Sequence, residues 1–146
     1  MSILKIDVDD IERLNDIQLT QLLKYLLNLE AHSSGIMQSS ISVALNINTG
    51  DGGEDGRIKW EEGPKYTDFL PSRFIQFQCK ATDMGPSSCA NEVVGSDEHI
   101  KPMVHSALED GATYVLFVNK TLNQQQIKKR IDAIREKYFI CGDCKY

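Results

Sequence analysis

The sequence predicts an α/β fold in which a mixed central sheet is flanked by helices. Residues 16–31 repeat apolar side chains with the period of a helix, whereas residues 41–81 contain three short segments of strand character. Residues 113–119 form a further apolar segment between helical patterns at about 100–110 and 123–138. The resulting order of helix, three strands, helix, strand and helix is typical of an α/β sandwich.

Residues 16–31 predict the first helix. Its apolar positions form one wide stripe, made of Ile17, Leu19, Leu22, Leu23, Leu26, Leu27 and Leu29. Asn15, followed three residues later by Gln18, matches a capping box, and Gly35 is a suitable stop. Glu30 falls on the apolar side of this helix. A carboxylate there needs a partner, so we expect either a base or a metal ion beside it.

Three segments predict neighbouring strands. Residues 41–47 alternate apolar and polar positions, and "RIKW" at 57–60 follows an acidic, glycine-rich loop. After a long turn, residues 73–81 form the third strand, with one apolar face and one polar face. The polar face carries Phe74, Gln76, Gln78 and Lys80. The apolar face is expected to meet the core, and the polar face must meet something else.

The second half of the chain predicts a helix, a strand and a helix. The helix at about 100–110 is closed by Gly111. The strand at 113–119 is continuously apolar, which is typical of a strand covered on both faces. The last helix, at 123–138, turns Ile127, Ile131 and Ile134 inward. Its outer face is basic and carries Lys128, Lys129, Arg130, Arg135 and Lys137.

The composition predicts one domain in the cytoplasm. With 146 residues, 41% of them hydrophobic, the chain 1–146 can bury a single core, at about 15–138. It has no apolar run long enough to span a membrane, so no membrane contact is expected. The start "MSILKIDVDD" lacks a basic stretch followed by an apolar one, and a cytoplasmic location is therefore expected.

The four cysteines are too few for a disulfide framework and are expected to be reduced. Cys141 and Cys144 have the CxxC spacing of a zinc knuckle or a redox pair. A structural zinc ion needs four ligands, and the sequence holds no second CxxC. Two interpretations stay open: a half-site that a longer parent protein completes, or two small residues near a frayed terminus.

The net charge of −5 argues against a domain that holds nucleic acid by bulk electrostatics alone. The charge is uneven, however. Residues 56–80 carry five basic and three acidic side chains, and residues 120–146 carry seven and three. A polyanion would therefore meet these two segments, and Arg57, Lys128 and Lys129 are candidates for contact with DNA phosphates.

The loop "TGDGGEDGRIKW", residues 49–60, allows three interpretations. Counted from Asp51, it offers most of an EF-hand pattern up to Glu62, but a strand enters the loop instead of a helix. A phosphate cradle would need a glycine-rich loop that opens a helix, and the acids here would repel phosphate. The third interpretation joins Asp55 to the polar face of the third strand, where Gln78 and Lys80 lie.

This third arrangement suits phosphodiester hydrolysis. Adjacent antiparallel strands bring such positions side by side, so Asp55, Gln78 and Lys80 are expected to converge at one edge of the sheet. The oxygen atoms would hold a hard divalent cation, and the lysine would steady developing charge or orient the attacking water.

"GDGGEDG" followed by "IQFQCKA" resembles the PD-(D/E)xK nuclease superfamily, specifically its Mrr-like restriction endonuclease branch. The loop of this branch ends in the catalytic aspartate, and its lysine motif is often QxK. The resemblance implies a restriction-endonuclease-like core and a Mg²⁺-dependent endodeoxyribonuclease acting on double-stranded DNA, with Mn²⁺ as a possible substitute. It implies that Asp55 is the first metal ligand, that Gln78 fills the second acidic position, and that Lys80 is the catalytic lysine. Glu30 would complete the metal shell.

Two departures from the family pattern stand out. The gap between Asp55 and Gln78 is 22 residues long, and glutamine is a weaker cation ligand than glutamate. The chain also resembles nuclease domains at the N-termini of large prokaryotic NTPases that defend against phages. This implies an effector within a longer protein, switched on by homo-oligomeric assembly. A catalytically inactive nuclease-fold module that binds nucleic acid or mediates assembly is the main alternative, and a calcium-binding module is another.

Overall fold

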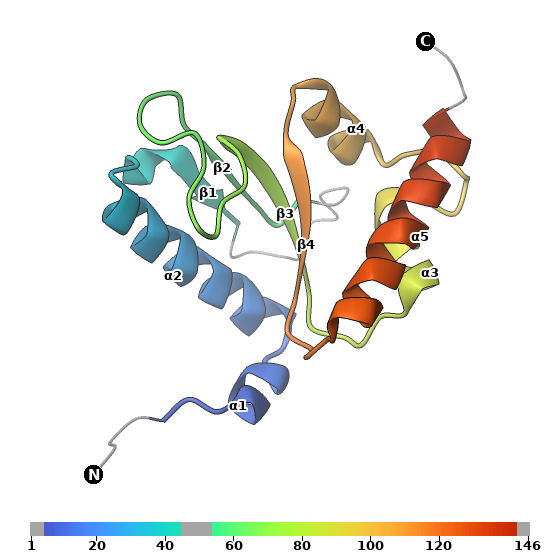
Figure 1. The fold of residues 1–146 in the computed structure, drawn as a ribbon, viewed down its shortest axis with the longest axis horizontal. Helices are drawn as coiled ribbons and strands as arrows, with labels where there is room; N and C mark the ends of the chain where they lie inside the picture. The colour runs from blue at the N-terminus through green and yellow to red at the C-terminus, as the bar shows by residue number, and fades with distance from the viewer. Residues whose placement is uncertain (1–4, 45–53, 143–146) are drawn as a thin grey trace.

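The structure is a computed structural model that describes residues 5–44 and 54–142. Its centre is a four-stranded sheet in the order β1-β2-β3-β4 (Figure 1). The strands are β1 (Ile41–Val43), β2 (Gly56–Lys59), β3 (Phe74–Lys80) and β4 (Thr113–Val118). The first three strands pair in antiparallel fashion, and β4 lies parallel to β3. The predicted mixed sheet is thus confirmed.

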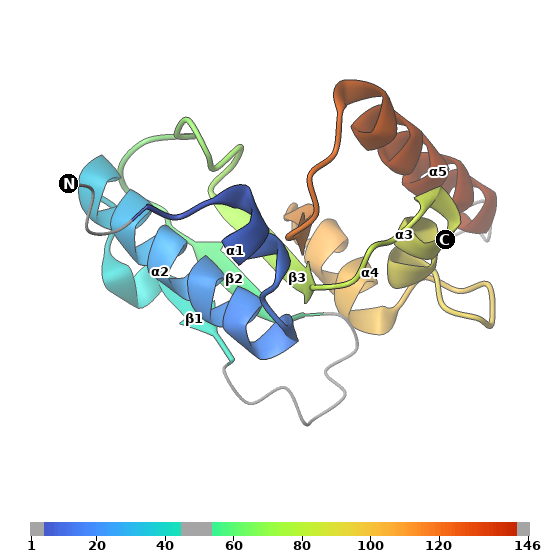
Figure 2. The ribbon, with the colours of Figure 1, turned by 90° about the horizontal axis from the view of Figure 1, so that it is seen from below.

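Helices cover the two faces of the sheet unequally. One long helix, α2, lies on one face with the short α1 near its start, while three helices lie on the other face (Figures 1 and 2). The helices are α1 (Val8–Glu12), α2 (Asp16–Ser34), α3 (Pro86–Val93), α4 (Pro102–Glu109) and α5 (Gln124–Gly142), with a 3₁₀ turn at Gln38–Ser40. None of the helices in these described ranges is long and apolar enough to cross a membrane.

Local signals set the limits of α2 as the sequence predicted. Asn15 Oδ1 accepts from Gln18 N at 2.9 Å, and Gln18 Oε1 accepts from Asn15 N at 3.0 Å. Gly35 ends the helix with φ at 71°, a left-handed conformation that suits glycine. The helix is anchored beyond its cap as well, because Ala81 N donates to Asp16 Oδ1 at 2.7 Å. The start of α2 therefore lies against the end of β3.

The main core lies between α2 and the sheet. Leu19, Ile58 and Ile75 have no exposed surface, and they pack with other apolar residues of α2, β2 and β3. This cluster contains Leu19, Leu23, Leu27, Ala31, Ile36, Ile58, Trp60, Leu70, Ile75, Phe77 and Cys79. The apolar face of β3 thus meets the core, as predicted.

The opposite face is packed less tightly, and one prediction about it is wrong. All six residues of β4 are only half-buried, although their apolar run predicted a strand covered on both faces. The reason is that α5 packs mainly against α3 and stands away from β4. Ile127 and Ile131, predicted to point inward, are 37% and 41% exposed.

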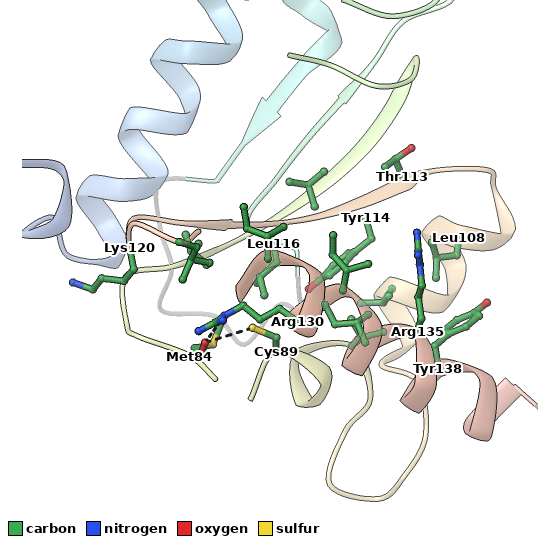
Figure 3. Close-up of a pocket in the computed structure, with 18 of the residues that line it drawn as sticks. Met84, Cys89, Leu108, Thr113, Tyr114, Leu116, Lys120, Arg130, Arg135 and Tyr138 are labelled. Atoms are coloured by element: carbon green, nitrogen blue, oxygen red, sulfur yellow. Dashed lines mark hydrogen bonds between the residues drawn. The ribbon is translucent and has the colours of Figure 1, made fainter. Parts of the chain in front are cut away.

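A groove separates β4 from α5. It has a volume of about 990 Å³ and apolar walls from β4, α3 and α5. In Figure 3, Tyr114 and Leu116 of β4 face Arg130 and Tyr138 of α5 across this groove.

Two helices were not predicted from the sequence. The short α1 has a capping box of its own, in which Asp10 Oδ2 accepts from Asp7 N at 2.9 Å. The second, α3, begins at Pro86, in a segment for which the sequence predicted no helix. Proline suits the first position of a helix because the amide there needs no helical partner. Of the predicted strand 41–47, Ile41–Val43 form β1 and Ala44 lies outside it, while residues 45–47 are outside the described part.

Candidate functional site

Asp55 lies against β3, beside Gln78. Its backbone N donates to the Phe77 carbonyl at 2.9 Å, and its Oδ2 accepts from the Cys79 backbone N at 2.7 Å. These two bonds fall on either side of Gln78 in the chain. The antiparallel pairing of β2 with β3 continues up to Gly56, so the hairpin delivers Asp55 to this point. The structure therefore brings Asp55 and Gln78 together.

Gln78 is buried and fully engaged on the polar face of β3. It is 6% exposed, its Nε2 donates to Glu92 Oε2 at 2.9 Å, and its Oε1 accepts from the Tyr114 hydroxyl at 2.6 Å. The chemistry fixes the direction of the amide. An ionised carboxylate only accepts hydrogen bonds, so the NH₂ group must face Glu92 and the oxygen must face Tyr114. Gln78 thus bridges β4 and α3.

The hydroxyl of Tyr114 stays protonated and can serve as this donor. Burial raises the pKa of Tyr114 well above its ordinary value, and the negative charges of Glu92 and Asp55 raise it further. The tyrosine stands on β4 with its ring in the wall of the groove (Figure 3).

Glu92, on α3, contacts Gln78 and also forms ion pairs with Lys80 and Lys101. Its Oε1 lies 3.4 Å from Lys80 Nζ and its Oε2 lies 3.3 Å from Lys101 Nζ. The carboxylate is 17% exposed, whereas the side chains of Lys80 and Lys101 are 31% and 27% exposed. Sequence reasoning missed Glu92 because it missed α3. With a helix from Pro86, its place beside the buried Cys89 and Val93 would have turned it toward β3.

A second buried polar side chain, Gln76, lies two residues before Gln78 on β3 and contacts Glu54. Gln76 has no exposed surface, and its Nε2 makes long hydrogen bonds to Glu54 Oε2 at 3.3 Å and to the Met103 carbonyl at 3.4 Å. Its Oε1 is buried and finds no hydrogen-bond partner within residues 5–44 and 54–142. An unpaired buried acceptor is costly unless a ligand or water completes it.

A small cavity adjoins these groups. It has a volume of about 170 Å³ and is lined by Glu54, Asp55 and Met103, together with Ser42, Ala44 and Gly56. The space is large enough for a hydrated ion or a few water molecules. Its lining places an acidic, partly open pocket beside Asp55 on the face covered by α4.

Arg57, a candidate for contact with DNA phosphates, is already paired with an acid in this region. Its guanidinium forms a two-point ion pair with Glu54, at 2.5 and 2.8 Å, and stacks over the ring of Phe74 at 5.5 Å. The hydrogen bond to Glu54 raises the pKa of Arg57 above its ordinary value. A phosphate contact by Arg57 would therefore compete with Glu54.

Glu30 is placed away from Asp55. It lies near the C-terminal end of α2, where its Oε1 accepts from Ser34 Oγ at 3.4 Å. The start of α2 contacts Ala81, whereas the carbonyl of Gly35 at its other end lies 3.8 Å from where a Cβ at Gly63 would stand. Glu30 therefore lies toward the hairpin turn, at the far end of β2 from Asp55.

The basic face of α5 begins close to the end of β3. Arg130 Nε donates to the carbonyl of Met84 at 2.9 Å, only four residues after Lys80. Lys128 and Lys129 directly precede Arg130 on α5, and Lys128 pairs with Asp132 at 2.5 Å. Both lysines are exposed.

The remaining sequence-based candidates are not supported by further geometry. Asp51 and the thiols of Cys141 and Cys144 lie outside the described part of the chain. The segments on either side of the acidic loop are β1 and β2, so an EF-hand helix pair does not form. Across residues 5–44 and 54–139, no three His, Cys, Asp or Glu side chains gather as a metal cluster. Cys79 and Cys89 are free thiols in the core.

No family model, curated protein or solved structure matches this chain.

Proposed function

We propose that this chain is a metal-dependent DNA endonuclease of the PD-(D/E)xK type, from the Mrr-like branch. One observation carries the proposal: Asp55 lies against β3 beside Gln78, and Lys80 follows two residues later on the same face. The observed order of α2, three strands, helices and β4 also agrees with the core that the resemblance implies. Asp55, Gln78 and Lys80 come from two sequence segments separated by a long hairpin.

The side chains present fit a hard divalent cation. This face of the sheet offers the Asp55 carboxylate, the amide oxygen of Gln78 and the buried Gln76 Oε1, which lacks a protein partner among the described residues. Oxygen atoms of this kind are the ligands that Mg²⁺ and Mn²⁺ prefer. Asp55 is the principal candidate to hold the ion, with Gln78 beside it.

The bound ion would supply positive charge that polarises the phosphodiester and lowers the pKa of water. The protein's own part is positional. Asp55 is held by the Cys79 amide, so its carboxylate is oriented before any ligand arrives. Lys80 brings an ammonium group to the same face, where Glu92 holds it at 3.4 Å. There it can neutralise charge that develops on a phosphate oxygen.

Double-stranded DNA is the proposed substrate. The groups that would meet its phosphates are Lys80 and Lys101 at the site and Lys128 and Lys129 on α5. With a net charge of −5, the chain is expected to bind DNA weakly on its own. This is consistent with an effector domain of a longer cytoplasmic anti-phage protein, in which homo-oligomerisation gathers several copies on one DNA molecule.

Nicking of supercoiled plasmid in the presence of Mg²⁺ tests the proposal. We expect wild type to nick the plasmid, and Asp55→Ala and Lys80→Ala to be slower by about a hundredfold or more. Lys59→Ala is the matched control, because Lys59 is an exposed lysine at the other end of β2, over Phe74. Absence of nicking by wild type at every protein concentration would contradict the proposal, as would equal nicking by Asp55→Ala.

One observation favours the alternative, an inactive nuclease-fold module. Both polar atoms of Gln78 are used within the protein, by Glu92 and Tyr114. In this alternative, Gln78 serves only to connect Glu92 and Tyr114, and the protein keeps its fold without binding an ion. This alternative predicts that wild type binds DNA but that calorimetric titration with MnCl₂ gives no heat of binding.

A further inference from the structure

We propose that Glu92, on α3, supplies the second carboxylate of the metal site, and that Gln78 is a positioning residue that holds Glu92 in place. This inference rests on the proposed endonuclease function. Under this proposal Glu92 of α3, and not Gln78 of β3, is the direct ligand beside Asp55. Glu92 would take the place of Glu30, the second carboxylate that the resemblance implied, which lies away from Asp55.

The hydrogen bonds of Gln78 are the first support. Its Oε1, the only atom of the side chain that could bind a cation, accepts from the Tyr114 hydroxyl at 2.6 Å. Its Nε2 is a donor and points at Glu92. Both ends of the amide are therefore fixed. In this orientation its NH₂ group faces α3 and holds the Glu92 carboxylate close to β3.

The charge that a divalent ion needs is the second support. Hard cations are held in proteins mainly by carboxylates, and a neutral amide contributes no charge. Glu92 Oε2 lies 2.9 Å from the amide nitrogen of Gln78, so it stands one hydrogen bond beyond the strand position where an acid is expected. Lys80 and Lys101 lie 3.4 and 3.3 Å from its carboxylate oxygens, so their positive charges offset its negative charge where it is half-buried.

The pairing of Glu92 with Lys80 is the third support. In the arrangement that the QxK pattern implies, an acid and a lysine act side by side. Here Lys80 Nζ lies 3.4 Å from Glu92 Oε1, so α3 places an acid next to this lysine. The end of α3 is fixed by two backbone contacts, from Val94 N to Ala90 O and from Lys101 N to Val93 O, each at 3.0 Å. Glu92 is therefore carried by a held element.

Calorimetric titration of the full chain with MnCl₂ tests the proposal. We expect Glu92→Gln and Asp55→Asn each to weaken Mn²⁺ binding at least tenfold relative to wild type. Glu136→Gln, on the exposed side of α5, is the control and should bind as wild type does. If Glu92→Gln binds Mn²⁺ with wild-type affinity while Asp55→Asn does not, Glu92 is not a ligand and the proposed function survives. If wild type itself binds no Mn²⁺, the proposed function fails.

An exchange variant tests the positioning role. The double variant Glu92→Gln/Gln78→Glu keeps one amide and one carboxylate in contact but moves the negative charge from α3 to β3. Tyr114 can still donate to the new carboxylate. We expect this variant to recover most of the Mn²⁺ affinity that Glu92→Gln loses. No recovery would show that Gln78 and Glu92 do not act as one pair.

A measurement on wild type covers the case in which a variant fails to fold. Sub-stoichiometric Mn²⁺ broadens the NMR signals of amides close to the bound ion. We expect the amides of Asp55, Gln78 and Glu92 to broaden first and that of Glu30 to stay sharp. Broadening at Asp55 and Glu30 without Glu92 would overturn the proposal.

Discussion

The two faces of the sheet differ in how tightly they are packed and in the kind of side chain that they bury. On the face covered by α2, apolar side chains interlock, and Leu19, Ile58 and Ile75 lose all contact with solvent. On the face covered by α3, α4 and α5, polar side chains of β3 are buried in pairs, and beside them a groove of about 990 Å³ stays open. One face therefore secures the fold. The other holds charged groups close to solvent, where a ligand can reach them.

The largest expected difference between the two faces is in how much stability is lost when an apolar side chain is truncated. Leu23, on α2, is 2% exposed, so Leu23→Ala should lower the free energy of unfolding by about 2–5 kcal/mol. Leu116, on β4, is half-buried at the groove, so Leu116→Ala should cost about 1 kcal/mol. Urea unfolding followed by circular dichroism measures both. Equal losses would mean that the groove is closed by packing in solution.

The next effect is a loss of stability at alkaline pH, which begins on the α2 face. Burial raises the pKa of Cys79 from 9.0 to about 12. Above pH 9 the unfolded chain loses this proton while the folded chain keeps it, so stability falls as pH rises toward 12. Between pH 8 and pH 10.5 the loss from Cys79 is about 2 kcal/mol, at roughly 1.4 kcal/mol per pH unit above 9.

Urea unfolding of wild type and Cys79→Ala at these two pH values isolates this contribution. Other groups titrate alike in the two proteins, so the variant should lose less stability by that amount. Tyr114, on the other face, has an ordinary pKa of 10.0 and a raised pKa in the fold, so its contribution starts later. The same pH dependence in both proteins would mean that the Cys79 thiol is not protected.

The smallest effect concerns DNA affinity. Lys128 and Lys129 lie on the side of the molecule that holds the site, whereas Lys24 is exposed on α2. If both α5 lysines contact phosphates, Lys128→Ala/Lys129→Ala should flatten the dependence of log K on log salt by about 2. Lys24→Ala should leave the slope unchanged. Fluorescence anisotropy with labelled duplex DNA in EDTA measures binding without cleavage. An equal change for Lys24→Ala would place DNA elsewhere.

Much of the α2 face could be predicted from the sequence, because its signals are local. The Asn15 capping box, the stop at Gly35 and the two-faced pattern of β3 each involve residues within a few positions of one another, and each is observed. The neighbourhood of Asp55 and Gln78 was also predictable, since antiparallel strands joined by a hairpin bring such positions together.

The other face could not be predicted in the same way, because its contacts join distant segments. Gln78 meets Glu92 and Tyr114, which come from α3 and β4, and no short-range pattern encodes that meeting. The apolar run of β4 predicted full burial, but burial depends on where α5 docks. Glu30 was chosen from its helical face alone, and position along the helix then placed it toward Gly63.

The parallel pairing of β3 with β4 has a consequence for the order of folding. Asp55 and Gln78 are joined by one hairpin, whereas Gln78 and Tyr114 are separated by 36 positions and by both α3 and α4. Closing the longer loop costs more chain entropy and slows the pairing. We therefore expect the β2–β3 hairpin to form early and the contacts among Gln78, Glu92 and Tyr114 to form late. In a newly made chain, Asp55 would then be held against β3 before Glu92 of α3 reaches Gln78.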